Sequence, residues 1–353
     1  MIGVGFSGPR SRPGFCCMLP AMSEPTPEDQ NDGMRGSEGV HPRPSTPLPE
    51  STVRKPLSDL TRRLLTAAFL VPLVTYLIVI GGYAYLIGVL VFGLLAQMEF
   101  YRLIEGKGAH PLVLTGLGFG AAVIAVAWVG SGYLATLLMT ASLLVLMVAQ
   151  LRKAQIQEAL ASISGTFFGV FYVAWLLSHA VLLRFFYNSA ADRYGTEDLF
   201  DLGVDPDSGI FLMLFCVVVV VLCDAGAYFA GRAWGRHKLA PEVSPNKSVE
   251  GALGGIVIGT LGGLFVKFVF DLFWPSLSAF LPWPVAMGLA FVLCPVGIIG
   301  DLVESLLKRD ADIKDTGALL PGMGGVLDRI DAVLLALPVM FYLLLGYLWL
   351  QLG

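Results

Sequence analysis

Long apolar segments alternate with short polar breaks along the chain from residue 57 onward. Each segment is about long enough to cross the roughly 30 Å hydrocarbon core of a bilayer as a helix. The pattern predicts an all-α polytopic membrane protein, a bundle of about nine transmembrane helices with a cytosol-facing polar site. The predicted helices cover residues 62–80, 83–100, 111–129, 132–150, 159–186, 209–230, 250–272, 283–307 and 330–351.

Residues 1–56 follow a different pattern. They are rich in Pro, Ser, Gly and Glu and show no hydrophobic periodicity. Such a segment cannot bury enough apolar surface to offset the entropy of ordering it. We therefore expect a disordered N-terminal tail over 1–56 and a transmembrane domain over 57–353. Met22 and Met34 are alternative start positions, since nothing before them resembles a folded segment.

Lysine and arginine gather before the first predicted helix and in every second break after it. The positive-inside rule places such breaks in the cytosol. The basic residues in question are Arg54, Lys55, Arg62, Arg63, Arg102, Lys107, Arg152, Lys153, Arg232, Arg236, Lys238, Lys247, Lys308, Arg309, Lys314 and Arg329. We therefore expect a cytosolic N-terminus, with the 231–249 loop and the 300–331 stretch facing the same compartment.

Composition supports a membrane protein and excludes several kinds of site. The chain of 353 residues is 56% hydrophobic and 14% charged, whereas soluble domains have roughly 25% charged residues. A net charge of −4 gives no sign of nucleic-acid binding. The five cysteines and four histidines lack the spacing of a zinc site or a disulfide framework.

The 300–331 stretch carries seven carboxylates and four basic side chains between two apolar runs. Asp328 and Asp331, three residues apart at the start of the last apolar run, share a helical face. Four polar residues on the preceding helix have the spacing i, i+3, i+4 and i+7 and also share a face: Asp301, Glu304, Ser305 and Lys308.

A glycine-rich turn, Pro321-Gly322-Met323-Gly324-Gly325, lies between these two faces and can bring backbone N–H groups close to a ligand. A solvated loop would explain charges between the helices. It would not explain acids at the ends of apolar runs, where unpaired charge is costly. The stretch therefore predicts a metal–polyphosphate site. No GxxxxGK[ST] motif is present, which argues against a P-loop NTPase.

Two further motifs precede this stretch. Asp224 lies inside a predicted span among small residues, which permit close helix approach. It is a site carboxylate or the partner of a site lysine, or else it has a structural role, capping a neighbouring helix or pairing with Arg232. The next loop contains a polar run before an apolar helix, and a helix N-terminus beside a lysine can bind phosphate. The residues of this run are Ser244, Asn246, Lys247 and Ser248.

Together these motifs resemble the signature of the phosphatidate cytidylyltransferases, or CDP-diacylglycerol synthases. The resemblance covers roughly residues 60–352. Its motifs are S-x-x-K-R at 305–309, K-D at 314–315, P-G-x-G-G at 321–325, D-R-x-D at 328–331, the helix end at 224–232 and S-P-N-K-S-x-E-G at 244–251.

The resemblance implies an enzyme that transfers CMP from CTP to phosphatidic acid and releases pyrophosphate. We expect Mg²⁺ as cofactor, with Asp301, Asp328 and Asp331 as ligands; a second cation could share the site. The expected catalytic residues are Asp301, Lys308, Lys314, Asp328 and Asp331. The expected substrate-binding residues are Asp224, Ser244, Asn246, Lys247, Ser248, Arg309, Gly324, Gly325 and Arg329.

The residues themselves agree with this chemistry. Phosphatidate is an anionic nucleophile at neutral pH, so its reaction needs charge screening more than a general base. One position departs from the family pattern, because Met323 stands where a histidine is usual. Methionine cannot donate a hydrogen bond or transfer a proton, so any role of that histidine must be met otherwise or be dispensable.

Two alternatives remain open. A transporter would place its charges near the bilayer midplane and contain repeats with broken helices. Another membrane lipid enzyme, such as a polyprenol kinase, would need similar metal and nucleotide features. We expect a multi-pass protein of a bacterial inner or plasma membrane that binds CTP, phosphatidic acid and membrane lipid, and no nucleic acid. A homodimer is expected by analogy alone.

Overall fold

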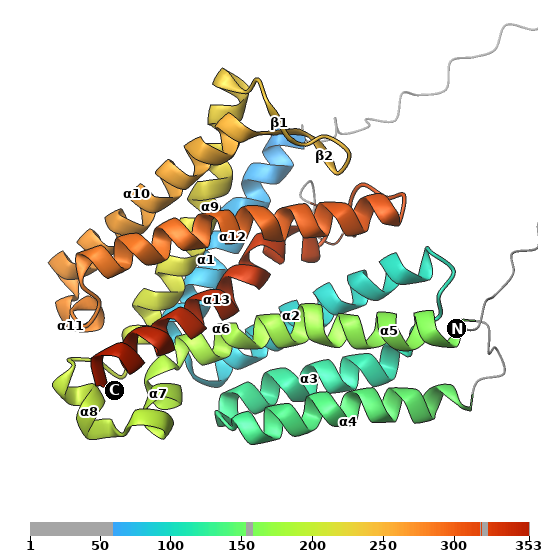
Figure 1. The fold of residues 1–353 in the computed structure, drawn as a ribbon, viewed down its shortest axis with the longest axis horizontal. Helices are drawn as coiled ribbons and strands as arrows, with labels where there is room; N and C mark the ends of the chain where they lie inside the picture. The colour runs from blue at the N-terminus through green and yellow to red at the C-terminus, as the bar shows by residue number, and fades with distance from the viewer. Residues whose placement is uncertain (1–58, 153–157, 318, 320–323, 353) are drawn as a thin grey trace, which may run out of the picture. The chain divides into compact units, whose positions relative to one another are not determined.

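The computed structural model describes residues 59–152, 158–317, 319 and 324–352 (Figure 1). The predicted tail, both alternative start positions and Met323 lie outside the described residues. The helices are α1 (Asp59–Ile80), α2 (Gly82–Glu105), α3 (Val113–Val129), α4 (Gly132–Gln150), α5 (Ala159–Gly169), a π-helical turn (Val170–Trp175), α6 (Leu176–Arg184), α7 (Phe186–Tyr194), α8 (Thr196–Asp201), α9 (Ser208–Trp234), α10 (Val249–Phe273), α11 (Pro275–Ser278), α12 (Trp283–Asp310) and α13 (Leu327–Leu352).

The protein is an all-α polytopic membrane protein, as predicted. Seven helical segments of the described chain are long and apolar enough to cross a membrane: α2, α4, the continuous α5–α6 segment, α9, α10, α12 and α13. Two shorter apolar helices, Leu64–Ile80 within α1 and Val113–Val129, coincide with the remaining two predicted spans. The predicted positions of all nine segments therefore match apolar helices.

Two glycines form a tight turn between α1 and α2. Gly81 and Gly82 both have positive φ angles, of 62° and 56°, which glycine adopts without steric cost. The buried Arg184 fixes this turn, because its Nε donates to the Ile78 carbonyl at 2.6 Å. A second donation, from Nη2 to the Val79 carbonyl at 3.4 Å, satisfies another carbonyl at the end of α1.

Glycines allow α9 and α10 to pack at close range. A Cβ on Gly255 would lie 2.6 Å from the Cys223 carbonyl oxygen, and one on Gly251 would lie 2.8 Å from that of Ala227. Small residues at such positions let two membrane helices approach backbone to backbone. The same approach brings the N-terminus of α10 close to the part of α9 that carries Asp224.

A short hairpin connects these two helices and was not predicted. Strands β1 (Lys238–Ala240) and β2 (Ser244–Ser248) pair antiparallel. Ser248 ends the hairpin and caps α10, since its Oγ accepts the Gly251 N–H at 3.1 Å.

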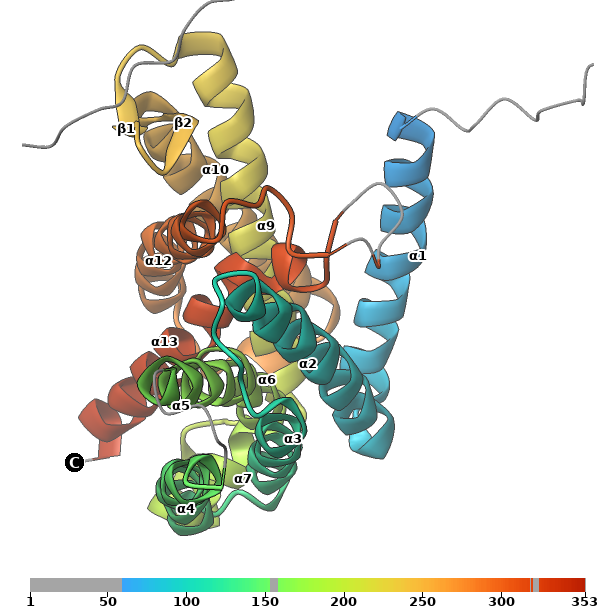
Figure 2. The ribbon, with the colours of Figure 1, turned by 90° about the vertical axis from the view of Figure 1, so that its right-hand side faces the viewer.

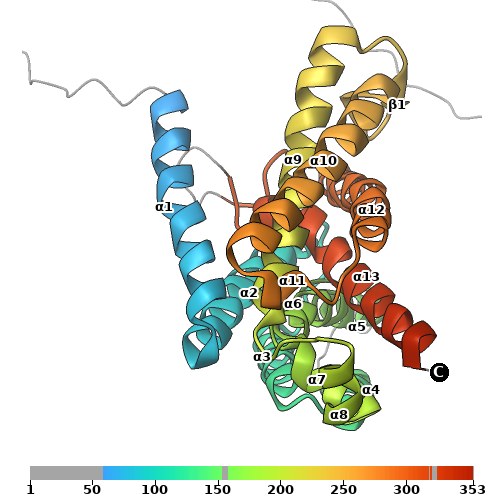
Figure 3. The ribbon, with the colours of Figure 1, turned by 90° about the vertical axis from the view of Figure 1, so that its left-hand side faces the viewer.

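The hairpin and α1 lie on different sides of α9. Figures 2 and 3 show α9 between α1 on one side and α12 on the other. The first turns of α13 also pack beside α9. This arrangement positions the candidate site.

Candidate functional site

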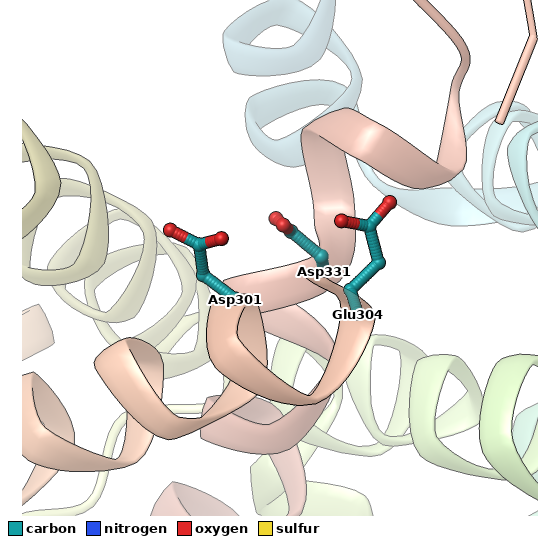
Figure 4. Close-up of side chains that lie close together, drawn as sticks. All are labelled: Asp301, Glu304 and Asp331. Atoms are coloured by element: carbon teal, nitrogen blue, oxygen red, sulfur yellow. The ribbon is translucent and has the colours of Figure 1, made fainter. Parts of the chain in front are cut away.

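Three carboxylates from two helices converge on one small volume. Asp301 and Glu304 lie one turn apart on α12, and Asp331 lies one turn after the start of α13. One oxygen of each carboxylate lies within 4.8 Å of an oxygen of the other two. In Figure 4 all three side chains point to the same side of the two helices. We call Asp301, Glu304 and Asp331 the acidic cluster.

A glycine lets the two helices bring this cluster together. A Cβ on Gly300 would lie 2.8 Å from the Asp331 carbonyl oxygen and 3.1 Å from the Ala332 Cα. Any larger residue would therefore force α12 and α13 apart. The spacing along α12 was visible in the sequence, whereas this contact between helices was not.

The donor set of the acidic cluster fits a hard divalent cation. Such ions prefer oxygen ligands, and carboxylates supply both the ligand atoms and the compensating charge. Glu304 is fully buried, and its Oε1 accepts no hydrogen bond from the described residues. A buried carboxylate oxygen without a donor is costly. Asp301, Glu304 and Asp331 could therefore hold a metal ion.

Two lysines lie against the acidic carboxylates. Lys247 of β2 places its Nζ 2.6 Å from Asp301 Oδ2. Lys308 of α12 contacts Glu304 and also lies 3.0 Å from Asp328 Oδ1. Both ammonium groups are mostly buried, so their charges are weakly screened by water. Cations at these positions can neutralise the charge of a bound polyphosphate.

Asp328 has a different environment from the cluster. Its Oδ2 accepts the N–H of Gly325 at 2.8 Å and that of Thr316 at 3.1 Å. With Lys308 on Oδ1, the carboxylate fixes the loop before α13 to α12. The sequence predicted Asp328 as a metal ligand, whereas the geometry groups Glu304 with Asp301 and Asp331. The ligand role of Asp328 stays a prediction.

A cavity of about 500 Å³ opens between α9, α10, α12 and the hairpin, and we call it the polar cavity because several charged and polar side chains line it. It is lined by six of the predicted site residues, which were drawn from three separate sequence motifs: Asp224, Ser244, Asn246, Lys247, Ser248 and Asp301. Tyr228 and Arg232 of α9 also line it, and Arg232 Nη1 donates to the Tyr228 hydroxyl at 3.1 Å. The volume and the mixture of donors suit a small charged ligand.

A second, apolar cavity of about 410 Å³ lies against another face of α9. Its walls come from α1, α2, α6, α9 and α13, and among its described lining residues Arg329 alone is charged. Ala332 of α13 lines the polar cavity, whereas Arg329 and Val333 line the apolar one. The first turns of α13, which carry Asp331, therefore run between the two cavities.

The remaining predicted residues lie around this centre. Arg309 donates from Nε to the Val243 carbonyl at 3.4 Å, which links α12 to the hairpin. Lys314 is exposed in the loop after α12. Gly324 has a φ of 88°, and a Cβ there would lie 2.7 Å from Asp328 Oδ2, so glycine suits both the conformation and the space.

Two buried acids, one in the site and one beside it, were not selected from the sequence. Glu304 was placed on the polar face of its helix but was not named as a site residue. Glu99 of α2 is fully buried and lies against the start of α13. Its signal was a single acid within a predicted apolar span, which by default indicates a functional or paired charge.

Known proteins match this chain over the region that contains the site. The model of the Cytidylyltransferase family matches residues 61–347, a range that includes every site residue described above. A relative named phosphatidate cytidylyltransferase from Haemophilus influenzae is 42% identical over 144 residues, which cover 39% of this chain and 47% of that protein. One of the same name from Bacillus subtilis is 43% identical over 136 residues, which cover 38% of this chain and 48% of that protein.

These two alignments span about half the length of each relative. A phosphatidate cytidylyltransferase from Synechocystis sp. is 29% identical over 297 residues, which cover 80% of this chain and 95% of that protein. The family match extends from α1 to the last turns of α13. The chain belongs to the Cytidylyltransferase family.

Proposed function

We propose that the protein transfers CMP from CTP to phosphatidic acid, giving CDP-diacylglycerol and pyrophosphate. The observation that carries this proposal is that Asp301 of the acidic cluster lines the polar cavity, while the first turns of α13, which carry Asp331, border both this cavity and the apolar one. A nucleotide and a lipid phosphate could each occupy one cavity and meet at the first turns of α13. The names of the relatives support the same pair of substrates.

The polar cavity suits the nucleotide. Lys247, Arg232 and the hydroxyls of Ser244 and Ser248 face it and could bind the triphosphate. The apolar cavity suits an acyl chain, and Arg329 at its wall could bind the lipid phosphate. In the reaction an oxygen of the lipid phosphate forms a bond to the α-phosphorus of CTP. The bond from that phosphorus to the departing pyrophosphate breaks.

We propose Mg²⁺ as the cation of the acidic cluster, with Asp301, Glu304 and Asp331 as its ligands and Asp328 as its neighbour. When bound, it would supply charge neutralisation at the transferring phosphoryl group. Lys247 and Lys308 extend the positive charge on either side of the cluster. Both substrates are anions, so without these charges they would repel each other.

We also propose that the end of the molecule with the hairpin faces the cytosol of a bacterial cell. Basic residues gather at this end, among them Lys107, Arg236, Lys238 and Arg309. CTP would then reach the polar cavity from the compartment in which nucleotides are made. The lipid would enter from the membrane.

The proposal predicts CDP-diacylglycerol formation by the purified protein in detergent, dependent on both CTP and Mg²⁺. Excess EDTA should abolish the activity, and added Mg²⁺ should restore it. Product lipid and pyrophosphate are measured by thin-layer chromatography and ³¹P NMR. A well-folded protein that forms no CDP-lipid would refute the proposal, and CTP with a polyprenyl acceptor would then be tested.

A bulky side chain in the apolar cavity should impair use of the lipid but not of CTP. Val218 lines this cavity from α9, so Val218→Trp should reduce kcat/KM for phosphatidic acid about tenfold, since overpacking costs roughly 1–3 kcal/mol. The KM for CTP should stay unchanged. Val257→Trp on the exposed face of α10 is the matched control. Equal effects of the two variants would contradict an acyl-chain role for the cavity.

A further inference from the structure

Glu99 connects α2 to the start of α13, although the two segments are far apart in the sequence. Its Oε2 accepts the N–H of Leu327 at 2.9 Å and the hydroxyl of Thr316 at 3.4 Å. Leu327 is the first residue of α13, and its N–H has no acceptor within that helix. Glu99 therefore caps α13 from another part of the bundle.

The segment held by Glu99 is the one held by Asp328. Thr316 donates its hydroxyl to Glu99 and its backbone N–H to Asp328. Gly317 and Gly325 leave room for this contact, since a Cβ on either would collide with the Glu99 carboxylate. The carboxylates of Glu99 and Asp328 therefore both accept hydrogen bonds from Thr316. Each also accepts a backbone N–H close to the start of α13.

This fixation reaches the acidic cluster. Leu327 and Asp331 are four residues apart on α13, one helical turn, so they share a face. A shift or fraying of the first turn would move Asp331 relative to Asp301 and Glu304, which belong to α12. Cluster oxygens that must converge on one ion tolerate little displacement.

Burying the Glu99 carboxylate costs desolvation free energy. The side chain is fully buried, and its Oε1 accepts no hydrogen bond from the described residues. A buried carboxylate is usually retained where it compensates another charge or serves a site. Here it faces the positive end of the α13 dipole, which offsets part of the desolvation cost.

We propose that Glu99 is a positioning residue, which fixes the first turn of α13 and thereby aligns Asp331 with Asp301 and Glu304. This inference rests on the proposed function for its kinetic consequences, but its structural consequences stand without it. In this role Glu99 acts through the backbone N–H of Leu327 and the hydroxyl of Thr316.

The test compares Glu99→Ala, Glu99→Gln and the wild type as full-length proteins in detergent. In Glu99→Ala we expect faster amide hydrogen exchange in the peptide that contains Leu327. We also expect Mn²⁺, bound alone and followed by EPR, to bind about tenfold more weakly. Glu99→Gln keeps one acceptor oxygen and should lie between the two. Glu105→Ala, which removes an exposed acid from the last turn of α2, should match the wild type.

The kinetic readout separates positioning from general destabilisation. Glu99→Ala should lower kcat about 10- to 100-fold, because small displacements of reacting groups have effects of this size. The KM for CTP should stay within about threefold, since the polar cavity is lined mainly by α9, α10, α12 and the hairpin. If Glu99→Ala does not fold, Glu99→Gln is compared with the wild type by the same measurements.

Unchanged Mn²⁺ affinity and kcat in a folded Glu99→Ala protein would overturn the inference. So would a loss of thermal stability in that variant with kcat retained. If the wild type formed no CDP-lipid at all, the proposed function would fail. Hydrogen exchange and Mn²⁺ binding would then still decide the role of Glu99.

Discussion

Replacing Asp301 by asparagine is expected to lower the rate of CDP-lipid formation on the order of 10²- to 10³-fold, because a metal-binding carboxylate supplies several kcal/mol of transition-state charge stabilisation. Asp301 combines more roles than any other residue of the site. It belongs to the acidic cluster, lines the polar cavity and pairs with Lys247 at 2.6 Å. Its Oδ1 also accepts the Ser305 hydroxyl at 3.3 Å.

Asparagine has the same shape as aspartate but carries no charge and offers one oxygen instead of two. The fold should therefore persist while cation binding weakens. The measurements are the initial rate at saturating CTP and lipid, and the binding of Mn²⁺ followed by EPR. Full Mn²⁺ affinity in the Asp301→Asn protein would argue against a cation at the cluster.

Asp310→Asn provides the matched control. Asp310 ends the same helix but is exposed, and it pairs with Lys107 at 3.5 Å. Exposed ion pairs contribute little, typically about 0–1 kcal/mol. We therefore expect its activity and Mn²⁺ affinity to match the wild type. A comparable loss in both variants would show that general charge, and not the cluster, determines the rate.

Hydrophobicity alone sufficed to predict the long apolar helices of this fold, whereas the short helices α7, α8 and α11 were not predicted. An apolar run of membrane length has no stable alternative to a helix in lipid, because every backbone group must be satisfied internally. The hairpin of β1 and β2 was missed for the converse reason. Its strands of three and five residues lie in a polar loop, where no alternation of apolar and polar positions marks a strand.

The candidate site was predicted in its parts but not in its pairing. Helical spacing placed Asp301 and Glu304 on one face, and it placed Asp328 and Asp331 on one face. Which acid of the second pair would face the first depended on the loop before α13. Backbone N–H groups of that loop bind Asp328 and leave Asp331 for the cluster. No pattern in the sequence specifies such a contact.

The contact between α2 and α13 could not be predicted from the sequence either. The partners Glu99 and Leu327 are 228 residues apart, and periodicity carries no information at such a separation. The two cavities depended in the same way on how α1, α9 and α13 pack. Sequence motifs thus identified the chemistry, while packing determined which residues meet.

Replacing Lys308 by methionine is expected to destabilise the protein strongly as well as inactivate it. Lys308 lies between Glu304 and Asp328, whose side chains are 1% and 5% exposed. Without the ammonium group both carboxylates lose their cationic partner inside the protein. Removing one partner of a buried ion pair typically costs about 3–5 kcal/mol. The measurement is the thermal midpoint of the purified protein in detergent, together with the rate of CDP-lipid formation.

Lys107→Met is the matched control, because Lys107 also pairs with an aspartate but is 41% exposed. It should change neither the thermal midpoint nor the rate.

The double variant Glu304→Gln/Lys308→Met separates stability from activity, since it removes a carboxylate together with the lysine. Coupled groups of this kind are not additive, so the double variant should regain much of the lost stability. It should stay inactive, because Glu304 is also a member of the acidic cluster. A double variant as unstable as Lys308→Met alone would show that the lysine stabilises the fold by packing and not by its charge.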